Sequence, residues 1–236
     1  MNLHQILCAL CAATIVASSP LVSRATSFFG PINYLSAADT PDEFHCDLCD
    51  QCVSVLEDFE DNSLDHGLTI EGFDGQILYP GFGTGLDGLT DSVDADDGAI
   101  DGIGNEGYSY FSPGNTLTIH FPTSVKAAGV VWTDGDIGSQ TLFEAYGPDG
   151  LIYSYGPVSL ADMSFQGTTA EDTFFGVQDA NGITHLVLTN IGGLGIEIDH
   201  IQYEDCDACA AIPEPNAAAL LCFGALGVVG FRRRNR

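Results

Sequence analysis

The feature that most constrains the fold is a series of short apolar–polar alternations separated by residues that break regular structure. Leu117, Ile119 and Phe121 alternate with polar neighbours, which is typical of a half-buried β-strand. Gly, Asp, Asn and Pro stand between such runs, and the sequence between residues 26 and 211 shows no helical periodicity. About ten short strands of this kind predict an all-β fold, namely a jelly-roll-like antiparallel β-sandwich.

Two pairs of strands are expected to form hairpins, because turn residues separate them. Residues 147–150 read Gly-Pro-Asp-Gly and lie between two apolar–polar runs. Residues 179–182 read Asp-Ala-Asn-Gly and separate two further runs in the same way. Segment 26–52 has no periodicity, and we expect it to be an extended lead-in.

The charge of the chain excludes one class of partner. All but one of the 33 acidic residues lie between residues 26 and 211, where Lys126 is the one basic residue. The net charge of this body is therefore −31, that is, one positive charge against 32 negative ones. Nucleic acid is excluded as a partner, because phosphate contacts need clustered Lys and Arg. Divalent cations would relieve the repulsion, and an alternative is that the charge serves solubility alone.

An aspartate-rich stretch is the candidate metal site. Five aspartates fall within eleven residues: Asp91, Asp94, Asp96, Asp97 and Asp101. Ca²⁺ takes about six to eight oxygen ligands, so this composition predicts a calcium site, although the spacing is not that of an EF-hand. Asp134 and Asp199 are possible further ligands. The alternative is that these aspartates are turn residues, for which Asp and Gly are well suited.

Both ends of the chain carry apolar segments. Residues 6–17 have the length of a signal-peptide core, and a small-x-Ala site predicts cleavage after Ala25. Near the other end, residues 217–231 carry no charge and would span about 22 Å as a helix, which is short against a hydrocarbon core of about 30 Å. Arginines follow directly and would hold this end on the cytoplasmic side. The sequence therefore predicts export with a short C-terminal membrane-anchoring helix.

Cysteines flank the strand-rich part of the chain. Three precede it and two follow it: Cys46, Cys49, Cys52, Cys206 and Cys209. In an exported protein, disulfides between the two groups would close a loop of about 155 residues and add roughly 4–5 kcal/mol of stability in the chain-entropy model. The alternative is a zinc site from four of the five, since both groups have Cys-x-x-Cys spacing. Because five is odd, one thiol stays free or pairs with another chain.

The C-terminal segment resembles the PEP-CTERM sorting signal of Gram-negative bacteria. It has a Pro-Glu-Pro triplet, a short apolar helix and an Arg-rich end, carried by Pro213, Glu214, Pro215, Arg232, Arg233 and Arg234. The resemblance implies recognition by an exosortase, a membrane-embedded processing enzyme, then cleavage near the triplet and export to the cell envelope, outer surface or extracellular matrix. The body resembles that of a recurrent kind of PEP-CTERM protein, a secreted β-sandwich of lectin-like architecture.

We therefore expect five parts along the chain. They are a signal peptide (1–25), an acidic Cys-containing lead-in (26–52), a β-sandwich domain (53–205), a Cys-containing linker (206–211) and a sorting signal (212–236). The expected function is non-enzymatic: a surface or matrix protein, steadied by Ca²⁺, that binds extracellular polysaccharide or serves a structural role. The alternative is an extracellular glycan hydrolase that uses a carboxylate pair.

Overall fold

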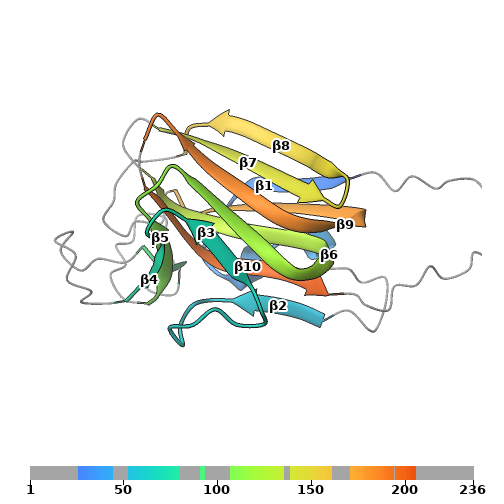
Figure 1. Cartoon of the computed structure of the whole chain (residues 1–236), viewed down its shortest axis with the longest axis horizontal. Helices are drawn as coiled ribbons and strands as arrows, with labels where there is room; N and C mark the ends of the chain where they lie inside the picture. The colour runs from blue at the N-terminus through green and yellow to red at the C-terminus, as the bar shows by residue number, and fades with distance from the viewer. Residues whose placement is uncertain are drawn as a thin grey trace, which may run out of the picture. The chain divides into compact units, whose positions relative to one another are not determined.

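Ten β-strands and two short 3-10 turns make up the described part of the chain in the computed structural model (Figure 1). The structure describes residues 26–44, 53–79, 91–93, 107–135, 139–160, 171–193 and 195–205. The strands are β1 (Ser27–Asn33), β2 (Val53–Glu57), β3 (Thr69–Gly72), β4 (Gln76–Leu78), β5 (Ser109–Ser112), β6 (Thr116–Gly135), β7 (Gln140–Gly147), β8 (Gly150–Val158), β9 (Thr173–Ile191) and β10 (Ile196–Asp205). The turns are η1 (Ala37–Asp39) and η2 (Asp42–Phe44). The all-β prediction is confirmed.

Two long strands, β6 and β9, hold the sandwich together. Thr116–His120 of β6 pairs with His185–Thr189 of β9, and Ala127–Trp132 pairs with Thr173–Gln178. Register shifts separate the two paired stretches, so both strands contribute to two layers. The first layer contains β1, β2, β4, β5 and β10 beside the second half of β6 and the first half of β9. The second contains β3, β7 and β8 beside the remaining halves of β6 and β9.

The core lies between the layers, and a smaller cluster covers the outer face of the first layer. Alternate residues of β6 separate the two, because successive side chains of a strand point to opposite faces. Trp132 packs in the main core with residues of β7, β9 and β10. Val131 belongs to the second cluster, together with Tyr34, Phe44 and Val93. Residues 34–44 and 91–93 therefore pack on the outer face of the first layer.

One expected hairpin forms and the other does not. Gly147 and Gly150 are paired at the tip of the β7–β8 hairpin, as predicted (Figure 1). Residues 179–182, in contrast, lie within the continuous strand β9, so the prediction of a hairpin there is wrong. Both halves of β9 pair with β6 and not with each other. Gly182, at φ +96°, lets the strand bend and continue, and Lys126 of β6 donates to Ala180 O (2.7 Å) across the bend.

The lead-in has more regular structure than the sequence indicates. β1 pairs with β9, with Phe28 opposite Val177. The chain then stays on the sheet, since Tyr34 N donates to Asp172 O (2.9 Å). Ser36 begins η1 with a capping box. The lead-in therefore contributes a strand of the first layer, β1.

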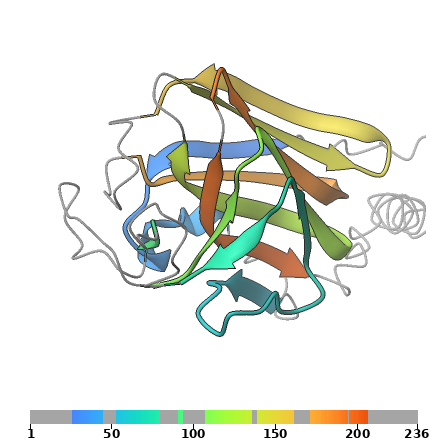
Figure 2. The ribbon, with the colours of Figure 1, turned by 60° about the vertical axis from the view of Figure 1, so that its left-hand side comes forward.

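β2 lies beside the C-terminal half of β10, with Val53 opposite Asp205 (Figure 2). Cys52 and Cys206 are the next residues in the sequence, so the two cysteine groups follow in the sequence from the same end of this ladder. The five cysteines that flank the strands lie outside the described residues, as do the predicted signal peptide and the C-terminal segment. Their disulfide or zinc assignment stays a prediction. Among the described residues, no helix has the length and apolar character that crossing a membrane requires.

Candidate metal site

The site lies on the first layer, where the end of β6 and the beginnings of β9 and β10 meet. Ile196 and Ile198 of β10 point into the core. Because strand side chains alternate, Glu197 and Asp199 point to the opposite face. Glu197 is opposite Asp134 near the end of β6. Glu197 and Asp199 are both buried.

Glu197 and Asp199 hold segment 91–93 on the sheet. Glu197 Oε1 accepts hydrogen bonds from Asp91 N (2.9 Å) and from the Ser109 hydroxyl. Asp199 Oδ2 accepts from Val93 N (3.0 Å) and from the Ser92 hydroxyl (3.0 Å). A carboxylate that accepts from a backbone N–H forms a strong, charge-assisted hydrogen bond. These contacts fix the backbone that carries the Asp91 side chain.

Three carboxylates converge there from distant parts of the chain. Asp91, Asp134 and Glu171 each offer one oxygen atom, and these three atoms lie within 4.8 Å of one another. Asp91 is 3% exposed, yet neither of its carboxyl oxygens has a hydrogen-bond partner among the described residues. An unsatisfied buried carboxylate costs more than about 1–3 kcal/mol. The single lysine of the described residues, Lys126, binds a backbone carbonyl at the bend of β9.

The protonation of these acids reflects their burial. Burial raises the pKa of Asp91 well above its usual value, and the nearby carboxylates of Glu197, Asp172, Asp134 and Glu171 raise it further. Burial also raises the pKa of Glu197 to about 7, although its hydrogen bonds from Ser109 and from Asp91 N oppose the rise. Both shifts have the direction expected for carboxyl groups that are removed from solvent.

The donor set points to a hard cation. All three converging ligands are carboxylate oxygens, which Ca²⁺ and Mg²⁺ prefer, while zinc and copper sites commonly use nitrogen or sulfur. Two oxygens bound to one Ca²⁺, each at about 2.3–2.6 Å, lie at most about 5 Å apart. The separation of the three oxygens is within that limit.

The structure brings some of the expected ligands together. Asp91 and Asp134 lie in the cluster, while Asp199 lies on the same face and positions segment 91–93 through its hydrogen bonds. The other four candidates, Asp94, Asp96, Asp97 and Asp101, lie outside the described residues. Glu171 and Glu197 were not among the expected site residues. The sequence does distinguish Glu197, because it stands between two isoleucines of a predicted strand. No sequence feature distinguishes Glu171 from the other acidic residues.

Comparison with known proteins identifies the C-terminal segment. A family model described as the PEP-CTERM protein-sorting motif matches residues 211–234. This confirms the interpretation of that segment, which marks an exported protein of the cell envelope or surface. The motif implies processing by an exosortase and anchoring of the tail in the membrane.

The same comparisons give less information about the body of the chain, residues 26–211. A search of curated proteins finds no significant match. Among solved structures, the chain is similar to a cleaved adhesin domain of Lys-gingipain from Porphyromonas gingivalis, with 10% sequence identity and a TM-score of 0.37. The match covers 64% of this chain and 97% of that one.

Proposed function

We propose that this exported chain is a non-enzymatic surface or matrix protein whose β-sandwich is stabilised by Ca²⁺ bound to Asp91, Asp134 and Glu171. One observation carries the proposal: the buried carboxylate of Asp91 points into an acidic cluster and has no hydrogen-bond partner among the described residues. A bound divalent cation would satisfy these oxygens and offset their mutual repulsion.

The position of the cluster indicates what the ion would do. Asp91 belongs to a segment packed on the outer face, Asp134 lies near the end of β6, and Glu171 precedes β9. An ion bound to all three would link segments that are far apart in the sequence. The ion would therefore stabilise the folded state, by about 2.7 kcal/mol when its concentration is 100 times the dissociation constant. Extracellular modules bind Ca²⁺ with dissociation constants of roughly 10⁻⁴–10⁻³ M, so millimolar calcium suits an exported protein.

Thermal unfolding in EDTA, in millimolar Ca²⁺ and in millimolar Mg²⁺ tests the site. We expect a rise in midpoint that is larger for Ca²⁺ than for Mg²⁺. Asp91→Asn should abolish this rise and also increase the midpoint in EDTA, because it removes a buried charge from the cluster. Asp149→Asn, at the exposed tip of the β7–β8 hairpin, is the matched control and should respond to Ca²⁺ as the unaltered protein does. Equal midpoints in all three solutions, or a full Ca²⁺ response in Asp91→Asn, would contradict the proposal.

Extracellular polysaccharide is the partner that we propose for this protein. Two tyrosine rings support it: Tyr79 is 38% exposed, and its ring centroid lies 6.1 Å from that of Tyr108. Aromatic rings present an apolar face against which a sugar ring can pack. Co-sedimentation with insoluble polysaccharide should weaken in Tyr79→Ala and persist in Phe73→Ala, an exposed aromatic control. Equal binding by both variants would remove this surface from the proposal.

The proposal includes no catalysed reaction. A glycan hydrolase needs two carboxyl groups that a sugar and a water molecule can reach. The carboxyl groups of Asp91 and Glu197 are both buried at the outer face of the first layer, out of reach of such a substrate. Measuring new reducing ends after incubation with polysaccharide distinguishes the two functions. Release that is lost in Glu197→Gln would replace the binding role with hydrolysis.

A further inference from the structure

The second layer ends at a strand that is hydrogen-bonded on one side only. In the order of the sheet β8 is the last strand, and β7 is its one bonded neighbour among the described residues (Figure 1). The backbone N–H and C=O groups on its other side therefore have no strand partner in this part of the chain. Such an edge is a template to which another strand can add.

The middle of β8 lacks the features that protect edge strands from pairing. Natural edges are commonly very short, or carry charges, Pro or bulges. β8 has nine residues and no charged side chain, and it is longer than β1, β2, β3 and β4, which also have a single bonded neighbour in the described part of the chain. Register shifts lie on either side of Tyr153–Tyr155, which pairs regularly with Phe143–Ala145. The regular, open part of this edge is therefore its centre.

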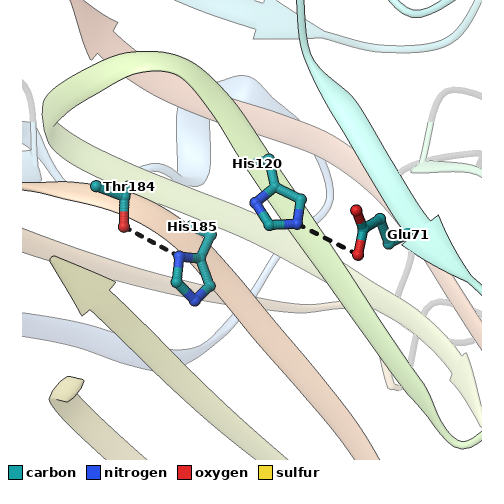
Figure 3. Close-up of polar contacts among 4 residues, drawn as sticks. All are labelled: Glu71, His120, Thr184 and His185. Carbon is teal, nitrogen blue, oxygen red and sulfur yellow. Dashed lines mark hydrogen bonds and ion pairs between the residues drawn. The ribbon is translucent and has the colours of Figure 1, made fainter. Parts of the chain in front are cut away.

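The charged side chains and the histidines of the second layer lie on its other strands. Glu71 Oε2 of β3 lies 3.6 Å from His120 Nε2 of β6, and the ring of His185 of β9 completes a histidine pair with centroids 5.3 Å apart (Figure 3). Glu144 is on β7, opposite Ser154. β8 is thus an uncharged margin of a body whose net charge is −31. Two copies of so acidic a chain repel each other, and this edge lets them approach without bringing carboxylates together.

Packing on the core side holds β8 in place. The ring of Phe28 of β1 stacks on those of Tyr153 and Tyr155, with centroids 4.6 Å and 4.9 Å away. Ser154, between the two tyrosines, is exposed on the solvent side, and Leu151 on the same strand is 55% exposed. The edge is therefore already ordered for a partner strand, which lowers the entropic cost of association.

We propose that β8 pairs with β8 of a second copy of this chain, in an antiparallel ladder about a two-fold axis at Ser154. Two-fold pairing of identical edges satisfies both of them at once. Ser154 is the middle residue of Gly150–Val158 and of the regularly paired stretch, so this register gives the longest ladder. Tyr153 of one copy then lies opposite Tyr155 of the other, and aromatic cross-strand pairs stabilise a sheet.

This register also keeps the nearest acidic side chains apart. Asp149 is five residues from Ser154, so the two copies of Asp149 lie ten residues apart along the ladder, about 33 Å. Glu144 is one strand away from β8, so its two copies are separated by three strand spacings, about 14 Å. Both separations exceed the Debye length of about 8 Å at physiological ionic strength. A parallel, in-register pairing would instead bring the two copies of Asp149 together.

Sedimentation velocity of the exported protein at increasing concentration tests the proposal, in saturating Ca²⁺ and after alkylation of free thiols. We expect a monomer–dimer equilibrium that shifts toward the dimer as NaCl is raised, because salt screens the repulsion between the acidic bodies. Ser154→Asp and Ser154→Lys each place two like charges opposite each other in the dimer. Each should raise its dissociation constant at least about 10-fold. Circular dichroism of the variants checks that they are folded.

An equimolar mixture of the two Ser154 variants gives a result that misfolding cannot produce. The introduced carboxylate of one variant lies opposite the introduced ammonium of the other, so the mixture should recover the dimer. Ser54→Lys is the matched control, because Ser54 is an exposed serine of another edge strand, β2, and this variant should dimerise as the unaltered protein does.

Four results would overturn the proposal. The first is a monomer at every concentration and salt, and the second is a dimer that both Ser154 variants retain. The third is an equal loss of dimer in Ser54→Lys. The last is a mixture of folded Ser154→Asp and Ser154→Lys proteins that stays monomeric where the unaltered protein dimerises.

Discussion

Replacing Glu197 with glutamine should stabilise the protein in EDTA at alkaline pH. The hydrogen bonds that this side chain accepts from Asp91 N and from the Ser109 hydroxyl reach the same oxygen, Oε1. The amide oxygen of glutamine can accept both of them. The substitution therefore keeps these contacts and removes the buried negative charge, with an NH₂ group in the place of Oε2.

The magnitude follows from the pKa of Glu197, which burial raises from 4.5 to about 7. In the pH range between these values the folded state binds a proton more readily than the unfolded state, so stability falls as the pH rises. At about 1.4 kcal/mol for each pKa unit, the full cost above pH 7 is about 3 kcal/mol. It is absent below about pH 4, where both states are protonated. For a domain of this size, about 3 kcal/mol corresponds to a midpoint change of roughly 6–12 °C.

The assay is thermal and urea unfolding of both proteins in EDTA at pH 5 and pH 8. Glu71→Gln, which replaces an exposed glutamate, serves as the control and should change stability little. We expect the gain from Glu197→Gln to be large at pH 8, smaller at pH 5, and reduced by Ca²⁺ at pH 8. A variant that is no more stable than the parent at pH 8, or a gain that does not depend on pH, would refute the electrostatic reasoning.

Three further predictions concern the body of the sandwich. Gly129→Ala should cost about 1–3 kcal/mol in urea unfolding, because a Cβ there would lie 2.5 Å from the ring of Phe174. Tyr34→Phe should also cost about 1–3 kcal/mol, since its buried hydroxyl bonds a histidine and a glutamine of β10. Mass spectrometry of peptides from the unreduced protein should show a disulfide between the two cysteine groups, with Cys52–Cys206 as the pair that continues the β2–β10 register; peptides found only as free thiols would contradict it.

The strands could be predicted from the sequence because their apolar–polar alternation is local. Leu117 and Ile119 illustrate this, since each is flanked by polar residues and each lies in the core. The course of the chain between strands was harder to predict. Residues 179–182 have the composition of a hairpin turn, but the long-range ladder to β6 keeps both halves of β9 in one strand. Turn composition cannot distinguish a reversal from a bend, because both need a glycine with positive φ.

The candidate site was predictable only in part. Asp91 stood out because it begins an aspartate-rich stretch, and Asp134 because it ends a strongly apolar strand. Glu171 is one of many acids in this chain, and only the meeting of β6 and β9 brings it to the others. The histidine pair shows the same limit: His120 and His185 are 65 residues apart in the sequence, and the strand register alone makes them neighbours.

The place of β10 in the sheet determines how the domain would bear a mechanical load. The sorting motif follows β10, so tension from an anchored tail enters the domain at Asp205. At that end β10 is hydrogen-bonded to β2 on one side and to β6 on the other. A pull on this strand is therefore resisted by two ladders, where an edge strand would offer one. A surface protein held by its C-terminus in flowing liquid thus transmits drag directly into the middle of its first layer.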